Sequence, residues 1–408
     1  MKDKLNVLII GNGHYATGST VLEGKKETDK DFGVILPSVL ELRKQGFVDK
    51  IYLVARRWSK FPKLREKLKL MNEKFGWDTD ITLFPKDEEI KADAYKDALK
   101  SLPEPKAVII ATPDHLHKEM ILESIKYKSH FIVVKPVVTK LKDLEEIIEQ
   151  QQKAGVLGLV DYHKVYDEAN LILKEDYEKN KYGDIQHIFT KMTQRRDMLK
   201  IFGRWIGGEN NVNHYLGSHY IHLVGFITKA TPLNVRGTCQ FGVAKKDYNI
   251  DTPDLIETQI AWKAKNGTNF TSYHIAGWAD PSETAGMTYQ EIHIIGTNGH
   301  VESDQRYRGF ETTLSQKGQN IINPYFFYLN KGIDGDPDLE GKYGFKSIKI
   351  FIKSALAVEA GRDIDSFEEV LPTIKESRNV TAIIEAADRS LQNGSCVVQL
   401  TINKRNIE

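Results

Sequence analysis

The chain has 408 residues, 40% of them hydrophobic, which is enough for two domains with buried cores. Lysine and arginine (57) nearly balance aspartate and glutamate (56), which argues against nucleic acid or an anionic membrane as a partner. Cys239 and Cys396 have no metal-ligand or disulfide spacing, and the apolar run at residues 7–10 is too short for a signal peptide or a membrane span. We expect a cytoplasmic protein without a metal site.

The first apolar segment, Leu5–Ile10, leads into a loop of the form G-x-G-x-x-A. It predicts a buried strand followed by a dinucleotide loop, in which Gly11 permits a tight turn and Gly13 lets the backbone approach a pyrophosphate. Many such glycine triplets are ordinary turns, so the strands that follow must show whether this one is a dinucleotide loop. The cofactor-binding candidates here are Gly11, Asn12, Gly13, His14 and Tyr15. The next helix is expected near Val34, and polar residues 17–31 are either a surface insertion or a flap over the cofactor phosphates.

A second strand is expected at residues 50–55, and it ends in Arg56, Arg57 and Ser59. Sites selective for NAD usually place a carboxylate at this point, where it binds the ribose 2′-hydroxyl. A guanidinium can instead pair with a 2′-phosphate, a contact worth roughly 1.5–3 kcal/mol. The sequence therefore predicts NADP in preference to NAD; the alternative is that both arginines are simply solvated.

Three more apolar strands follow. The strand from Ala107 breaks at Thr112-Pro113, the strand from Phe131 reaches Lys135 before Pro136, and the last covers residues 156–160. We therefore expect Lys135 to lie at the carboxyl edge of the sheet, where ligands bind in open α/β folds. His115 and His117 lack carboxylate or cysteine partners, which favours a turn and a helix start over a metal site. Strands alternating with amphipathic helices predict a doubly wound parallel sheet.

The order of these segments resembles the glucose-fructose oxidoreductase/inositol dehydrogenase (Gfo/Idh/MocA) family. The run from Ala111 to His117, followed by Lys135-Pro136, is similar to the family's A-T-P-x-x-x-H and E-K-P, although Val134 replaces the glutamate. Gly217 and His219 resemble its D-x-G-x-H, with Tyr215 in place of the aspartate.

The resemblance covers nearly the whole chain and implies a two-domain α/β architecture. We expect an N-terminal Rossmann domain at residues 1–160 and a C-terminal α+β domain at residues 161–408. The second domain would hold a large, mostly antiparallel open sheet, a face through which the family commonly associates, here as a homodimer or homotetramer. Helices are expected near residues 346–360 and 373–391.

The resemblance also implies hydride transfer between NAD(P) and a secondary alcohol of a sugar, sugar derivative or cyclitol. The ordinary pKa of His219, near 6.5, suits it to exchange the hydroxyl proton. Lys135 could stabilise a developing alkoxide, and Tyr215 would share a helix face with His219. Further cofactor contacts are Thr112, Pro113 and His117, and the substrate candidates are His163, Lys164, Arg196 and Asn213. The alternative is a dinucleotide-binding regulator without turnover, which the two missing carboxylates favour.

Overall fold

The computed structural model describes residues 4–18, 32–203, 206–207, 210–316 and 318–401. The chain forms two compact units. The first contains Met1–Val137, Glu146–Tyr166 and Tyr325–Glu376, and the second contains Val138–Glu145, Asp167–Pro324 and Ser377–Glu408. These units differ from the predicted single cut at residue 160. The reason is that a late helix returns to the first unit, where its residues Phe345, Ile348 and Ile352 join the core.

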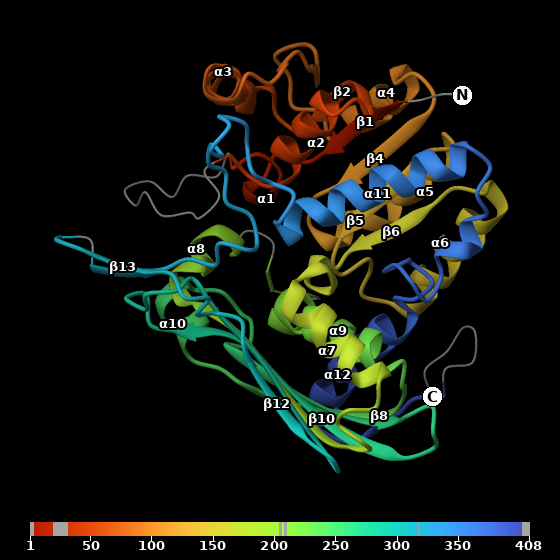
Figure 1. Cartoon of the computed structure of the whole chain (residues 1–408), viewed down its shortest axis with the longest axis vertical. Coiled ribbons are helices and arrows are strands. Elements are labelled where there is room, and N and C mark those ends of the chain that lie inside the picture. Colours follow the sequence, from red (N-terminus) through yellow and green to blue (C-terminus); the bar gives the residue numbers. More distant parts are fainter. Residues whose placement is uncertain (1–3, 19–31, 204–205, 208–209, 317, 402–408) are drawn as a thin grey trace. The chain divides into compact units, whose positions relative to one another are not determined.

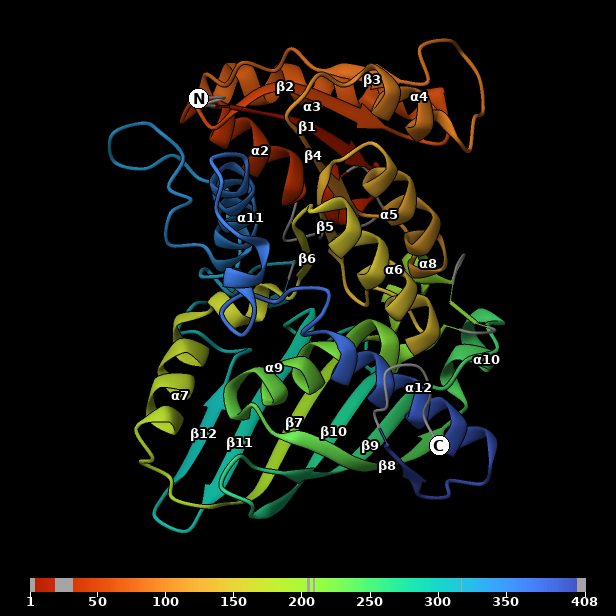
Figure 2. The same cartoon turned by 90° about the vertical axis from the view of Figure 1, so that its right-hand side faces the viewer.

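The first unit is built on a six-stranded parallel sheet (Figure 2). Its strands are β1 Leu5–Ile10, β2 Val48–Val54, β3 Thr82–Phe84, β4 Lys106–Ile110, β5 His130–Val134 and β6 Gly158–Asp161. Their order is β3-β2-β1-β4-β5-β6, and every neighbouring pair is parallel. The chain reverses direction across the sheet between β1 and β4, the point at which such sheets bind ligands.

Helices cover both faces of this sheet. They are α1 His14–Thr17, α2 Ile35–Lys44, α3 Phe61–Phe75, α4 Ala94–Ser101, α5 His117–Lys126, α6 Leu141–Ala154 and α11 Tyr343–Glu359. Helices α2, α3 and α11 share one core with Leu5, Val7 and Ile9 of β1. All six residues of β1 are buried, which explains its unbroken apolar sequence.

The segment after the glycine loop differs from expectation. A short helix, α1, already begins at His14, ahead of the helix expected near Val34, which is observed as α2 from Ile35. Most of the predicted insertion, residues 19–31, lies outside the described residues.

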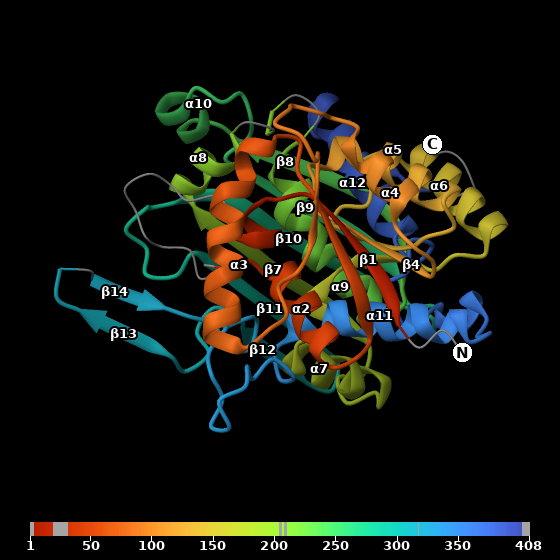
Figure 3. The same cartoon turned by 90° about the horizontal axis from the view of Figure 1, so that it is seen from above.

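The second unit is built on a seven-stranded sheet of order β12-β11-β7-β10-β9-β8-β15. Its strands are β7 Ile185–Arg195, β8 Thr231–Gln240, β9 Leu255–Lys263, β10 Asn269–Asp280, β11 Thr288–Gly296, β12 His300–Asp304 and β15 Val398–Gln399. Among the described neighbours in this sheet, the β7–β10 pair alone is parallel, so the predicted mostly antiparallel sheet is confirmed. Strands β13 Glu311–Leu314 and β14 Gly318–Ile321 form a separate hairpin (Figure 3).

The helices of the second unit are α7 Glu168–Glu178, α8 Leu199–Phe202, α9 Ser218–Thr228, α10 Val243–Tyr248 and α12 Arg378–Gln392. Helices α7, α9 and α12 lie over one face of the large sheet (Figure 1). On that face Ile256 and Ile260 are buried, whereas Tyr273 and Ile295 on the strands are exposed. The alternation is that of a sheet with one covered and one open face. Within the described residues, no helix is long and apolar enough to cross a membrane.

Candidate functional site

The glycine loop follows β1 at the carboxyl edge of the parallel sheet. Gly11 has a φ of 118°, and a Cβ there would lie 2.3 Å from the carbonyl oxygen of Ala111, so this glycine is required by the fold itself. A Cβ at Gly13 would meet nothing within 4 Å. Asn12 accepts a hydrogen bond from the hydroxyl of Thr17, which closes the turn. The open backbone at Gly13 fits the close approach of a pyrophosphate.

Tyr15 connects this loop to the end of β6. Its hydroxyl donates to Oδ2 of Asp161 over 2.7 Å, and the hydroxyl of Ser347 on α11 donates to Oδ1 over 2.5 Å. Asp161 is buried, and burial raises the pKa of its carboxyl, while the two hydroxyls and the Lys135 ammonium act in the opposite direction. Burial, together with the charge of Asp161, also raises the pKa of the Tyr15 phenol. Tyr15 is therefore a neutral donor.

Lys135 follows directly on β5. The last residue of that strand, Val134, is the cross-strand partner of Asp161, and the Lys135–Pro136 peptide is cis. The lysine side chain is half-buried. The predicted position of Lys135 at the carboxyl edge of the sheet is confirmed.

His117 joins two turns at this edge. Its Nε2 lies 2.8 Å from the carbonyl oxygen of Thr112, and its Nδ1 lies 2.9 Å from that of Pro136. The ring is fully buried, and burial lowers the pKa of the imidazole. Both ring nitrogens face protein carbonyl groups, so we assign His117 to the support of the loops rather than to direct contact with a cofactor. Thr112 and Pro113 lie half-buried between these two anchors.

The remaining candidates of the first unit lie beyond β2 and β6. Arg56, Arg57 and Ser59 are exposed just past the end of β2. The ring of His163 stacks on Tyr343 with centroids 5.7 Å apart. His163 also lies 4.0 Å from Asp161, measured from Nδ1 to Oδ1. The neighbouring Lys164 is only 1% exposed.

In the second unit, a π-helix over Asn213–Gly217 leads into α9. Tyr215 and His219 were expected on one face of a single α-helix. Instead Tyr215 lies in the π turn and His219 in α9, and their shared face stays a prediction. The π turn accommodates Asn213, whose Oδ1 would lie 2.0 Å from a Cβ at Gly217. π-helical turns occur frequently at functional sites.

Asn213 has a feature that its sequence position does not reveal. Its side chain is 1% exposed, and neither amide atom has a hydrogen-bond partner in the described part of the chain. Buried amides are almost always paired, so an unpaired one is a position where a polar ligand or a water would be stabilised.

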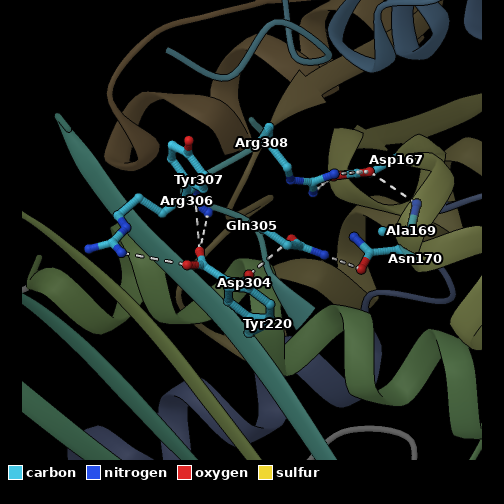
Figure 4. A network of polar contacts seen from close by, with 9 residues as sticks. All are labelled: Asp167, Ala169, Asn170, Tyr220, Asp304, Gln305, Arg306, Tyr307 and Arg308. Atoms are coloured by element: carbon cyan, nitrogen blue, oxygen red, sulfur yellow. Dashed lines mark hydrogen bonds and ion pairs between the residues drawn. The ribbon is translucent and has the colours of Figure 1, made fainter. Parts of the chain in front are cut away.

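His219 itself is nearly buried on α9, and the next residue fixes that helix in place. The hydroxyl of Tyr220 donates to Gln305 over 3.0 Å, and Gln305 donates to Asn170 on α7 (Figure 4). In the same network Arg308 pairs with Asp167, the N-cap of α7, at 2.6 Å. The helix that carries His219 is thus tied to α7 and to the segment after β12.

Two other candidates of the second unit lie beside aromatic and carbonyl groups. The ring of Tyr215 packs between Phe202 and Trp278, with centroid distances of 4.6 and 6.3 Å. Arg196 donates to the carbonyl oxygen of Ala279 over 3.0 Å and is only partly exposed. The described residues contain no group of three or more histidine, cysteine, aspartate or glutamate side chains that could hold a metal ion.

Comparison with known proteins supports the resemblance seen in the sequence. Residues 62–162 match a family model described as an oxidoreductase family with an NAD-binding Rossmann fold. Myo-inositol 2-dehydrogenase of Thermotoga maritima is 27% identical over 279 residues, which covers 66% of this chain and 78% of that protein. These matches support the resemblance of the chain to the Gfo/Idh/MocA family of oxidoreductases.

Solved structures of inositol dehydrogenases share the fold along almost the entire chain. Myo-inositol 2-dehydrogenase of Lactobacillus plantarum superimposes with a TM-score of 0.68 at 15% identity, covering 97% of this chain and 99% of that one. Scyllo-inositol dehydrogenase of Lactobacillus casei, solved with NAD(H) and scyllo-inositol, gives 0.65 at 13% identity, with the same coverage. At these identities the likeness shows the fold alone.

Two residues of the candidate site have no counterpart in the sequence predictions. In the sequence, Asp161 appeared only as a carboxylate at the end of β6, the strand that follows β5 and Lys135. Ser347 had no signal, since it lies 186 residues from its partner in the chain. Lys135 and His219 belong to different units, and their shared role at one substrate hydroxyl stays a prediction.

Proposed function

We propose that this protein is an NAD(P)-dependent dehydrogenase acting on a secondary alcohol of a sugar, sugar derivative or cyclitol. The observation that carries the proposal is the carboxyl edge of the parallel sheet. There the glycine loop, Thr112-Pro113 and Lys135 follow the neighbouring strands β1, β4 and β5. The inositol dehydrogenases among the relatives, one of them solved with NAD(H) and scyllo-inositol, support the choice of substrate class.

The residues present fit a dinucleotide. Gly13 leaves open space for a pyrophosphate, and Gly11 keeps the loop close to β4. Asn12, His14 and Tyr15 complete that loop, while Thr112 and Pro113 would flank the nicotinamide end. When bound, a nicotinamide supplies the hydride acceptor or donor, which no side chain can replace.

The protein's own groups would supply binding and proton transfer. Lys135, as an ammonium ion, would hydrogen-bond the alcohol oxygen and stabilise the negative charge that develops there. His219 would accept the hydroxyl proton and return it in the reverse direction. Tyr215 would hydrogen-bond the imidazole or the substrate.

Four further groups would recognise the hydroxyls of the substrate: His163 and Lys164 in the first unit, and Arg196 and Asn213 in the second. The unpaired amide of Asn213 can both donate and accept, which suits a hydroxyl-rich ligand.

Arg56 supports a preference for NADP over NAD. Its side chain is exposed at the end of β2, where the ribose 2′ position is read in dinucleotide folds. A guanidinium can bind a phosphate through two parallel hydrogen bonds.

The open face of the second sheet supports association into a homodimer or homotetramer. Tyr273 and Ile295 are 39% and 52% exposed on strands β10 and β11. Exposed apolar groups on a broad sheet are typical of a protein interface.

The test is spectrophotometric turnover with NAD⁺ and NADP⁺ against a panel of sugars and cyclitols. We expect wild type to reduce the cofactor with at least one panel member. Lys135→Ala and His219→Gln should each lose about 10²-fold or more of that rate. The exposed Lys126→Ala is the control and should keep it. A wild type that binds cofactor but oxidises no panel member would instead support the regulatory alternative.

A further inference from the structure

We propose that Asp161 is the positioning residue for Lys135: its buried carboxylate keeps the lysine protonated and directs the ammonium toward the substrate oxygen. The inference rests on the function proposed above for Lys135, and it adds a residue that the family motifs do not contain.

The strand register brings the two residues together. Strands β5 and β6 are parallel neighbours, and Val134 is the Cα partner of Asp161. Adjacent strands lie about 4.8 Å apart, and Lys135 is the next residue after Val134. Both side chains therefore leave the sheet at the same carboxyl edge, and the Lys135 ammonium lies close enough to act on the Asp161 carboxyl.

The surroundings of Asp161 call for a cation. The residue is 3% exposed, and its two oxygens accept one hydroxyl each, from Tyr15 and Ser347. Hydroxyl donors are neutral, so they orient the carboxylate without balancing its charge. A buried carboxylate without a counter-charge costs several kcal/mol or takes up a proton, and each oxygen retains a free lone pair.

Other titratable groups also face this carboxylate. Tyr15 and Tyr166 are phenols whose pKa burial raises, so they stay neutral at pH 7. The imidazole of His163 is the other possible cation, at 4.0 Å. Lys135 is the better counter-ion because its ordinary pKa keeps it charged across the whole neutral range, whereas that of histidine does not.

The residue at position 134, a valine, gives an independent reason to pair Asp161 with Lys135. It occupies the position of the glutamate in the E-K-P pattern, and its side chain lies on the same face of the sheet as that of Asp161 because the two are register partners. In this chain the carboxylate next to the lysine has moved one strand across the sheet. A second substitution can therefore move it back.

The experiment compares Asp161→Asn with the double variant Asp161→Asn/Val134→Glu. Asparagine keeps the shape and removes the charge. The pKa of Lys135 is measured without turnover, by competitive labelling with an amine-reactive reagent across pH, read by mass spectrometry of the peptide that contains it. The high-pH limb of kcat/KM is measured in parallel. Glu359→Gln is the control, since it removes a carboxylate that pairs with His130 in the same unit at 3.1 Å.

We expect the labelling pKa of Lys135 and the high-pH limb to fall by about one unit or more in Asp161→Asn. Both should recover in the double variant and stay unchanged in Glu359→Gln. An unchanged labelling pKa in Asp161→Asn overturns the inference. If wild type oxidises no substrate yet the labelling pKa falls as expected, the proposed function fails while the pairing stands.

Lys135→Met provides a second test if Asp161→Asn does not fold. Removing the ammonium leaves the Asp161 charge buried alone, so this variant should be less stable than wild type at pH 7. The difference should shrink as the pH falls and Asp161 takes up a proton. A stability difference that does not change with pH contradicts the pairing.

Discussion

The imidazole of His117 is hydrogen-bonded to the backbone of Thr112, with 2.8 Å between Nε2 and the carbonyl oxygen. The other side of the ring reaches the carbonyl oxygens of Pro136 and Val137, at 2.9 and 3.1 Å. One buried side chain therefore joins the turn after β4 to the turn after β5. Those turns carry Thr112 and Lys135, so the ring sets the spacing of two parts of the candidate cofactor site.

His117→Leu should lower stability and weaken cofactor binding together. Leucine fills a similar volume but has no N–H, so the carbonyl oxygen that accepts from the imidazole loses its donor, at a cost of about 1–3 kcal/mol. Denaturant unfolding and a cofactor titration monitored by fluorescence measure the two effects. The exposed His115→Ala is the control and should change neither. If His117→Leu unfolds at the wild-type denaturant concentration, the ring does not connect the turns.

Arg56→Asp should weaken NADP binding by about 10–100-fold, because a charge-assisted contact to the 2′-phosphate is lost and a like charge is introduced. NAD binding should change far less. Dissociation constants for the two cofactors, measured by titration calorimetry, give the ratio. Lys100→Asp makes the same change of charge on α4 and controls for general electrostatics. Equal losses for NAD and NADP would exclude the phosphate contact.

Gly13→Ala and Gly11→Ala should separate binding from folding. A methyl at Gly13 meets no protein atom within 4 Å, so that variant should unfold like wild type yet bind cofactor at least about tenfold more weakly. A methyl at Gly11 would collide with the Ala111 carbonyl, and we expect clear destabilisation. Thermal unfolding with and without cofactor distinguishes the two. Unchanged affinity in Gly13→Ala would place the pyrophosphate elsewhere.

Asn213→Leu should preserve or raise stability while impairing substrate binding. Leucine has a similar shape and removes two buried polar atoms that lack partners, a gain of up to about 1–3 kcal/mol. If the amide binds a substrate hydroxyl, KM should rise more than kcat falls. Asn170→Leu is the matched control, because it breaks the bond to Gln305 and should destabilise the fold. Unaltered kinetics in Asn213→Leu would assign that amide to a bound water.

Local sequence patterns predicted the helices and strands, but they did not predict which of these pack against one another. The unbroken apolar run of β1 and the breaks at Thr112-Pro113 and Lys135-Pro136 indicate buried parallel strands, because such strands are covered on both faces. The resemblance implied a helix near residues 346–360, which is observed as α11, but not that it packs on the first sheet. A helix expected from its position in the chain does not show which core it joins, so the unit boundaries could not be predicted.

In the candidate site, too, local patterns were predictable and long-range contacts were not. Lys135 was found because a proline fixes where its strand stops. Asp161, Tyr15 and Ser347 meet across 146 and 186 residues of chain, and no local period encodes such a contact. The π turn before His219 was equally hidden from local sequence patterns.

His274 predicts how the stability of the second unit depends on pH. Its ring is fully buried between the hydroxyls of Thr190 and Ser272, each 2.8 Å away, and Trp262 donates to Ser272 over 2.7 Å. Trp262 thus directs the Ser272 hydroxyl proton toward the ring, an arrangement that suits a neutral imidazole. Burial lowers the pKa of His274 to about 3.

In the unfolded chain His274 takes up a proton near pH 6.5, but in the folded protein it does so only near pH 3. Its contribution to stability is therefore fully present above pH 6.5 and falls by about 1.4 kcal/mol for each pH unit below it. Urea unfolding at pH 7.5, 6 and 5 measures that slope. His274→Gln should be less stable than wild type at pH 7.5, with a gap that narrows toward pH 5. The exposed His300→Gln is the control and should keep the wild-type slope. If His274→Gln and wild type lose stability in parallel over this range, the buried ring is not the group that makes the fold sensitive to acid.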